Sequence, residues 1–279
     1  MPLMKWLHVI LSHSIFIAIC AVAMALQTVQ LRHFHSSSLV YGFIFFATLC
    51  SYNFYWILSR LSFSKEIHPG VFIKKEAVAI SLFIFSGAGL LFCLLHSSIP
   101  TGFVLTAGLL TMLYSIPLLP FKFLVFARRP GVLKTIMLAF TWTYVTAFIP
   151  LQKTYLLLDS ADLFIITRRF LFMFMLCIIF DSRDIAVDKL RGLHSLATDL
   201  SPAALQLLVY SVFIVLFGTN LLSTSYGVTV YQSIALQVST ITLLVVYFYS
   251  TRKQGYLFYY FLVDGLMLFS AMVTYIASI

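Results

Sequence analysis

Charged residues are scarce in this chain, which limits the class of protein that it can form. Of its 279 residues, 10% are charged and only nine are acidic, whereas 61% are hydrophobic. A water-soluble globule of this length needs more polar side chains than that to cover its surface. The sequence also has no low-complexity segment and no linker long enough to separate domains. It predicts an integral membrane protein in which residues 1–279 form a single transmembrane domain.

The four cysteines lack the spacing of a metal site. No Cys-x-x-Cys pair occurs, and no histidine is close enough in sequence to complete a zinc set. All four lie inside apolar runs, and we expect them to be small core residues: Cys20, Cys50, Cys93 and Cys177.

Long apolar runs fill most of the chain. A helix needs about 20 mostly apolar residues to cross a bilayer, and nine runs approach or reach that length. They predict an all-α, polytopic membrane protein, a single bundle of about nine transmembrane helices. The runs cover residues 7–27, 38–59, 77–96, 101–120, 135–151, 163–180, 203–223, 227–250 and 256–277.

Lysine and arginine predict the orientation of this bundle. If the N-terminus shares one side with the loops after spans two, four, six and eight, only four of the 18 basic residues fall elsewhere: Arg32, Lys153, Arg168 and Arg169. Basic loops stay in the cytoplasm, so we expect a cell-membrane protein with a cytoplasmic N-terminus and site loops, and with its C-terminus on the opposite side. We expect the Arg168–Arg169 pair to snorkel to the external surface.

The net charge of +9 follows from this asymmetry and from attraction to anionic lipid headgroups. It therefore gives no reason to expect nucleic-acid binding, and the sequence indicates no protein partner.

Three of the nine acidic residues gather at the end of the sixth apolar run. If the helix continues through Asp188, then Asp181, Asp184 and Asp188 share one stripe, because they are spaced i, i+3 and i+7. Such a stripe repels itself at neutral pH, and two ways of balancing it remain open. One is a divalent cation shared by the carboxylates. The other is ion pairing with the interleaved basic residues Arg183, Lys189 and Arg191.

A cytoplasmic face with acidic residues, basic loops and an aromatic bundle suits an amphiphilic anion. Cations on the aspartates could hold phosphate oxygens, basic side chains could neutralise the remaining charge, and a hydrocarbon tail could lie among the helices. A polyprenyl diphosphate has this shape.

Two motifs resemble those of one protein family. The stretch Asp181-x-x-Asp184-x-x-x-Asp188-x-x-x-Gly192 resembles the second aspartate motif of the UbiA-type superfamily of intramembrane polyprenyl transferases. An earlier succession is similar to that family's Tyr-Ser-x-Pro, Lys, Leu-Lys, Trp pattern; it comprises Tyr114-Ser-Ile-Pro117, Lys122, Leu133-Lys134 and Trp142. The resemblance implies transfer of a polyprenyl group from an allylic diphosphate to a membrane-embedded aromatic or lipid acceptor, with Mg²⁺ as cofactor.

The resemblance also implies roles for particular residues. Asp184 and Asp188 would hold magnesium with help from Asp181, while Lys122 and Lys134 would contact the diphosphate. Tyr114 would lie near the reacting carbon, where its ring could stabilise positive charge. Without the motif, the two lysines would be ordinary flanking charges and Tyr114 an interfacial anchor. We expect further substrate contacts from Asn53, Arg183 and Lys189.

The first aspartate motif of that family is incomplete here. Asn53 is kept, but Ile57 and Leu61 stand where the resemblance places two aspartates. A site with fewer carboxylates holds cations more weakly. One hypothesis is that nearby basic side chains replace the missing metal: Arg60, Lys65, Lys74 and Lys75.

The missing acids keep a second function open, that of a catalytically altered relative which binds an isoprenoid lipid or serves as a partner subunit. For an enzyme, Asn53 should face Asp184 and Asp188 across a common cavity, with Lys122 and Lys134 at its rim. Asp264, in the last span, is a buried acid that we expect to form a helix–helix hydrogen bond with Ser or Tyr.

Overall fold

The computed structural model describes residues 10–63, 69–115, 131–153, 155–191 and 194–279. In these ranges the chain forms helices and no strand. Seven helices are long and apolar enough to cross a membrane, and two shorter apolar helices, Ile15–Leu31 and Thr101–Leu113, accompany them. The prediction of an all-α polytopic membrane protein is confirmed, whereas the division into domains and the orientation in the membrane stay predictions.

Most helix boundaries lie close to those that the apolar runs predict. The long helices are α2 (Ile15–Leu31), α3 (Ser38–Phe63), α5 (Ala77–His96), α6 (Thr101–Ser115), α7 (Gly131–Thr143), α9 (Ser160–Arg191), α11 (Pro202–Leu221), α12 (Val230–Ser250) and α13 (Asp264–Ile276). Short elements are α4 (Pro69–Lys75), η3 (Tyr144–Phe148), α8 (Ile149–Leu151), η4 (Tyr155–Leu157), α10 (Leu196–Asp199), η5 (Ser223–Tyr226) and η6 (Phe258–Val263).

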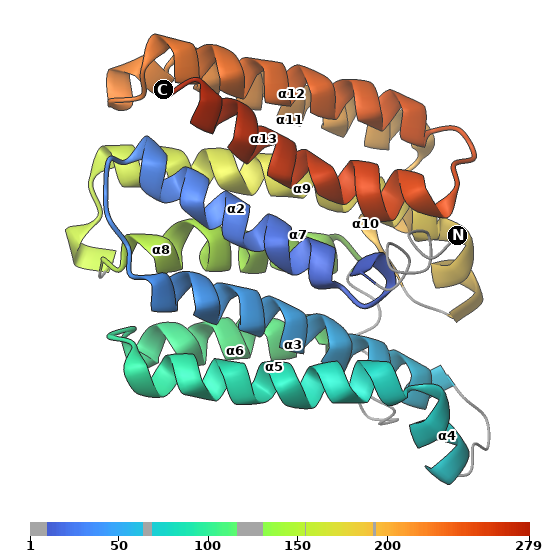
Figure 1. Ribbon diagram of the computed structural model, residues 1–279. Coiled ribbons are helices and arrows are strands. Elements are labelled where there is room, and N and C mark those ends of the chain that lie inside the picture. Colours follow the sequence, from blue (N-terminus) through green and yellow to red (C-terminus); the bar gives the residue numbers. More distant parts are fainter. Residues whose placement is uncertain (1–9, 64–68, 116–130, 154, 192–193) are drawn as a thin grey trace.

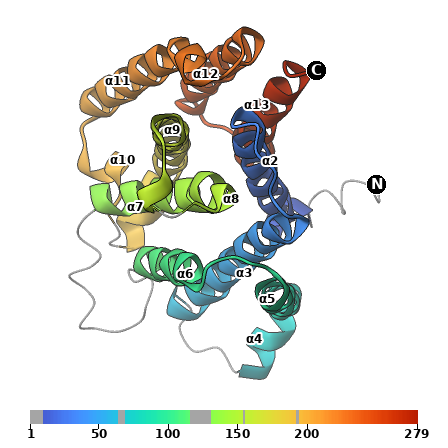
Figure 2. The same cartoon turned by 90° about the vertical axis from the view of Figure 1, so that its left-hand side faces the viewer.

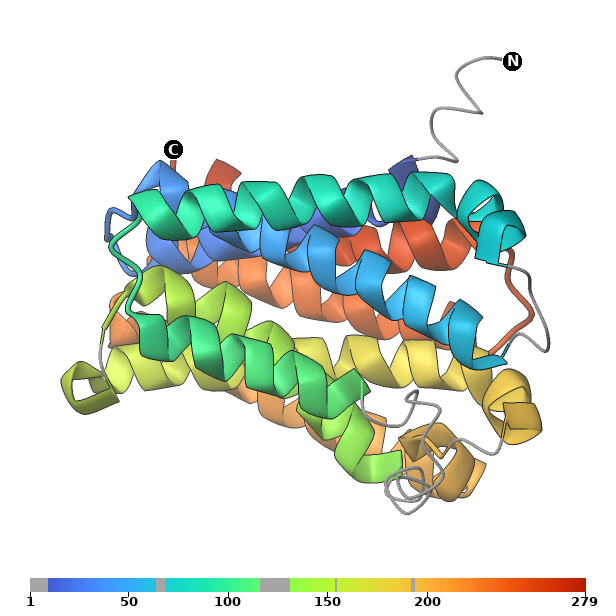
Figure 3. The ribbon, with the colours of Figure 1, turned by 90° about the horizontal axis from the view of Figure 1, so that it is seen from below.

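The long helices run side by side (Figure 1), and α9 lies in the interior of the bundle (Figure 2). It packs against α7, α10, α11 and α12. Helix α3 pairs with α5, and α6 lies alongside α7. Seen from below, α3, α5 and α6 are nearest to the viewer (Figure 3). The aspartate motif is therefore on the helix that the fold surrounds most completely.

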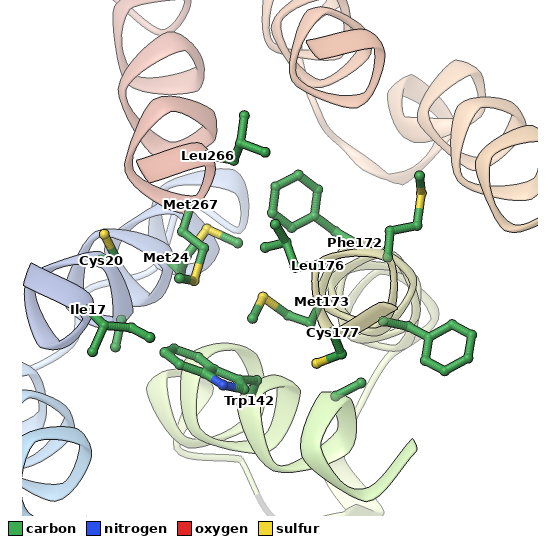
Figure 4. Close-up of a cluster of buried hydrophobic side chains, with 14 of the residues drawn as sticks. Ile17, Cys20, Met24, Trp142, Phe172, Met173, Leu176, Cys177, Leu266 and Met267 are labelled. Carbon is green, nitrogen blue, oxygen red and sulfur yellow. The ribbon is translucent and has the colours of Figure 1, made fainter. Parts of the chain in front are cut away.

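The core between α2, α7, α9 and α13 is filled by flexible and aromatic side chains (Figure 4). Met24, Met173 and Met267 meet there beside Trp142, and all four are buried. Methionine adapts to irregular gaps between helices because its side chain has several rotatable bonds. The described cysteines are free thiols, three of them buried and Cys50 partly so, as expected of core residues.

Two local irregularities were not predicted. The first apolar run is interrupted at Ser14, whose φ of 65° is left-handed, so that α2 begins only at Ile15. Two π-helical turns, η3 and η6, interrupt the spans that contain α7 and α13. Turns of this kind widen a helix by one residue and are frequent at functional sites.

The prediction for the adjacent arginines of α9 was wrong. Arg168 and Arg169 do not snorkel to a surface, since both side chains are fully buried. Arg168 Nε donates to Asn220 Oδ1 at 2.6 Å. Arg169 donates to Gln27 Oε1 at 2.9 Å and to the Met24 carbonyl at 2.9 Å. Neutral oxygens on neighbouring helices thus replace water around both guanidinium groups.

Candidate functional site

The motif aspartates lie on one continuous helix, because α9 extends to Arg191. Asp181 and Asp188 are buried, and the side chain of Asp184 is 39% exposed. The stripe that the spacing predicts is therefore present, and its members have different surroundings.

Asp181 is bound within the protein. Thr135 Oγ1 of α7 donates to Asp181 Oδ2 at 2.5 Å and accepts the Leu196 N–H at 3.4 Å. Gly131 permits this arrangement, because a Cβ there would come within 2.5 Å of the Ser195 nitrogen. Helices α7, α9 and α10 are thereby tied together around one carboxylate.

Asp188 faces the lysine of the earlier motif. Lys134 Nζ lies 3.9 Å from Asp188 Oδ2, and the lysine side chain is 17% exposed. Tyr55 of α3 is an electrostatic neighbour of the same ammonium group. The electrostatic surroundings of Lys134 therefore include residues of α3 and α9.

Asp184 is paired with the residue before it. Arg183 Nε and Nη2 donate to the two carboxylate oxygens of Asp184, each at 2.7 Å. The guanidinium carbon also lies 5.1 to 5.3 Å from the ring centroids of Phe180, Tyr259 and Tyr260, distances at which the ring faces attract a cation. Lys189 is exposed, and the side chain of Arg191 lies outside the described residues.

Asn53 and Asp264 are both buried, and their contacts differ. Asn53 Nδ2 donates to the Leu49 carbonyl at 2.8 Å and to the His13 carbonyl at 3.4 Å, next to the interruption before α2. Asp264 is buried, and no group of the described residues forms a hydrogen bond with its Oδ1. The predicted helix–helix hydrogen bond is therefore absent at that oxygen.

The aspartates do not form a ready-made magnesium site as they lie here. Among the described residues, no three Asp, Glu, His or Cys side chains gather closely enough to hold a metal ion. Each motif aspartate contacts a protein donor, and α3 offers Ile57 and Leu61 where two further carboxylates would complete the set. As the side chains lie here, the described residues form no complete set of magnesium ligands, and magnesium binding stays a prediction.

An apolar cavity of about 470 Å³ lies between α3, α5, α6 and the α7–η3 segment. This volume is within the range of small-molecule sites, about 300–1,000 Å³. Most of the surface that its wall exposes is apolar, and neither Asn53 nor any motif aspartate belongs to the wall. This cavity is therefore not the one expected between Asn53, Asp184 and Asp188, and that shared cavity stays a prediction.

The cavity does include members of the earlier motif. Ser115 and Trp142 line it, and the ring of Trp142 packs edge-on against Tyr52 at 6.1 Å. Lys134 is one helical turn before Leu138, another wall residue. Tyr114 is in α6, but its side chain and all of Lys122 lie outside the described residues. The structure thus connects the cavity with Lys134, and through it with Asp188.

Sequence reasoning missed Thr135, Tyr52 and Tyr55 as members of this region. The only signal for Thr135 was its position directly after Lys134, which belongs to the motif. The two tyrosines lie on either side of Asn53, but nothing in their spacing shows which face of α3 is turned toward the cavity.

The fold is similar to those of two solved structures. A UbiA homolog from Aeropyrum pernix K1 is 12% identical, with a TM-score of 0.57 over 94% of this chain and 96% of that chain. A structure described for digeranylgeranylglyceryl phosphate synthase is also 12% identical, with a TM-score of 0.53 over 100% and 99% of the two chains. No family model and no curated protein sequence matches the chain. The chain therefore shares its fold with a UbiA homolog, which is the fold that its two motifs predicted.

Proposed function

We propose that this chain is a membrane prenyltransferase. It would move a polyprenyl group from an allylic diphosphate to a membrane-embedded acceptor, either an aromatic compound or a lipid. The observation that supports this most directly is the apolar cavity, whose wall contains Ser115 and Trp142 and which ends one turn from Lys134. An apolar chamber with a cation at one end suits a ligand that is a hydrocarbon at one end and an anion at the other.

The cavity would bind the prenyl chain through the hydrophobic effect, at about 25 cal/mol per Å² of buried apolar surface. Lys134 would bind the diphosphate, and Lys122 would assist it if its place in the motif brings it to the same end. The Lys134–Asp188 separation of 3.9 Å is longer than a direct hydrogen bond. The ammonium group can therefore turn toward an anionic ligand without breaking a short contact.

In the reaction, the bond between the allylic carbon and the diphosphate oxygen breaks, and its electron pair leaves with the diphosphate. Lys134 stabilises the negative charge that develops on this leaving group. Tyr52, Tyr55 and Trp142 present aromatic rings near the cavity, which favour the positive charge on the allylic carbon. The acceptor then forms a bond to that carbon and releases a proton. Magnesium dependence stays a prediction, and none of these steps depends on it.

The test uses purified full-length protein in lipid nanodiscs with radiolabelled farnesyl or geranylgeranyl diphosphate and a membrane lipid extract as the source of acceptors. We expect a labelled lipid product together with release of diphosphate, measured with and without Mg²⁺. The variant Lys134→Met should reduce the yield, because Lys134 stabilises the charge on the leaving diphosphate. Absence of both product and released diphosphate under all conditions would refute the transferase.

A second function is favoured by a specific observation. Ile57 and Leu61 remove the first-motif acids, and Asp184 is fully engaged by Arg183. These features suit a relative that binds an isoprenoid lipid without cleaving it, alone or as a partner subunit. Saturable binding of the labelled diphosphate without diphosphate release would identify this function.

A further inference from the structure

We infer that the cavity limits the prenyl chain to three or four isoprene units and that Gly108 is the position at which this limit can be reset. The inference rests on the proposed function, because it assumes that the cavity holds the prenyl tail. To the proposed function it adds the length of the prenyl chain and one residue that determines this specificity.

The length of the cavity follows from its wall. On α3 the wall extends from Phe43 to Tyr55, and on α6 from Val104 to Ser115. At about 1.5 Å per helical residue, these stretches measure about 18 Å and about 16 Å. An extended isoprene unit adds about 5 Å, given four carbon–carbon bonds of about 1.5 Å in a zigzag. The tail of farnesyl or geranylgeranyl diphosphate therefore matches this length.

Aromatic side chains adjoin, in sequence, the part of the cavity wall that is distant from Lys134. Phe103 packs edge-on against Phe148 at 5.1 Å, and Phe148 stacks on Tyr144 at 4.9 Å. All three are buried, and they adjoin the wall residues Val104 and Val145 in sequence. A chain that continued in this direction would have to displace them from a packed core, which is costly.

Gly108 is placed near the middle of the wall. A Cβ added there would meet no atom within 4 Å, so a larger side chain has open space to enter. Gly108 is seven residues from Ser115, or about 10 Å along α6. Leucine at this position would therefore leave room for about two isoprene units and block the remainder.

Gly102 provides a matched control on the same helix. A Cβ at Gly102 also meets no atom within 4 Å, but this residue is not part of the cavity wall. Both substitutions replace glycine with a better helix former, so neither is expected to weaken α6.

The experiment measures equilibrium binding of geranyl, farnesyl, geranylgeranyl and hexaprenyl diphosphate to the full-length protein in nanodiscs. In the unaltered protein, farnesyl and geranylgeranyl diphosphate should bind at least about tenfold more tightly than the geranyl and hexaprenyl compounds. Gly108→Leu should lose this advantage and keep geranyl binding, while Gly102→Leu should behave like the unaltered protein. Val104→Phe, near the distant end, should weaken geranylgeranyl binding more than farnesyl binding.

The outcomes separate this inference from the proposed function. If no prenyl diphosphate of any length binds, the proposed function fails. If hexaprenyl diphosphate binds as tightly as geranylgeranyl diphosphate, or if neither Gly108→Leu nor Val104→Phe changes the order of affinities, the length limit is refuted while prenyl binding stands. Should Gly108→Leu fail to fold, Val104→Phe alone decides between these results.

Discussion

Arg169 Nη1 donates to Thr146 Oγ1 at 3.1 Å, which joins the buried guanidinium of α9 to the π-helical turn η3. The other nitrogen, Nη2, reaches Thr28 Oγ1 of α2 at 3.0 Å. One side chain thus connects three segments of the bundle, with neutral oxygens as its only hydrogen-bond partners among the described residues.

Replacing Arg169 with alanine should destabilise the protein by about 2–5 kcal/mol, because each buried oxygen left without its donor costs about 1–3 kcal/mol. Arg169→Lys should recover only part of this, since an ammonium group lacks the planar fork of a guanidinium. Thermal unfolding in detergent measures the effect. Arg252→Ala, at an exposed position after α12, is the control, and an equal loss of stability in both variants would contradict the role of Arg169.

Lys134 should matter more for diphosphate binding than other basic residues at the same end. We expect Lys134→Met to weaken farnesyl diphosphate binding about tenfold or more, because hydrogen bonds to charged groups contribute about 1.5–3 kcal/mol. Lys253→Met removes an exposed charge beyond α12 and should leave the affinity within about twofold, as expected of surface charges. Titration calorimetry distinguishes the two variants, and an unchanged affinity in Lys134→Met would remove the lysine from the site.

Restoring the first aspartate motif should strengthen magnesium binding. The double variant Ile57→Asp, Leu61→Asp adds two carboxylates to α3, where Leu61 is exposed and Ile57 partly so. Because cation affinity rises with ligand charge, Mg²⁺ should raise its melting temperature more than that of the unaltered protein. The neutral pair Ile57→Asn, Leu61→Asn has side chains of the same size, and an equal magnesium effect in both double variants would count against a metal site at this place.

Asp159, just before the first residue of α9, should give the protein stability that depends on pH. The Asp162 backbone N–H, with further help from Arg32 and Lys153, holds the pKa of Asp159 below its ordinary value. A lowered pKa means that the charged form stabilises the fold above the ordinary pKa of about 3.9, and that this contribution is lost as the pH falls through the lowered value. Melting temperatures between about pH 5 and pH 2.5 should therefore drop less in Asp159→Asn than in the unaltered protein. Identical pH profiles would show that Asp159 contributes nothing.

The apolar runs predicted the helices well because length and hydrophobicity determine which segments cross a bilayer. The run at residues 77–96 coincides with α5, and α9 continues through Asp188 as the aspartate spacing required. The interruption at Ser14 carries no proline or glycine that would indicate it. Beside this interruption, Asn53 Nδ2 of α3 donates a hydrogen bond to the His13 carbonyl.

The surroundings of buried polar residues could not be predicted in the same way. Arg169 was assigned to a surface because Gln27, Thr28 and Thr146, which surround it, are more than twenty residues away in sequence. The motifs indicated Lys134 and Asp188 as site residues, but they could not show that Asp184 would form an ion pair with Arg183. Local spacing defines a helix face, whereas tertiary packing decides what that face meets.

Helix α9 has 32 residues, which gives it a length of about 48 Å at about 1.5 Å per residue. The hydrocarbon layer of a bilayer is only about 30 Å thick, so an upright helix of this length extends about 18 Å into the headgroup layers. The motif occupies its last turns, so we expect it at the depth of the phospholipid phosphates rather than in the hydrocarbon layer. An isoprenoid diphosphate already anchored in that leaflet could therefore reach the protein by lateral diffusion, with its charged end hydrated until the moment of capture.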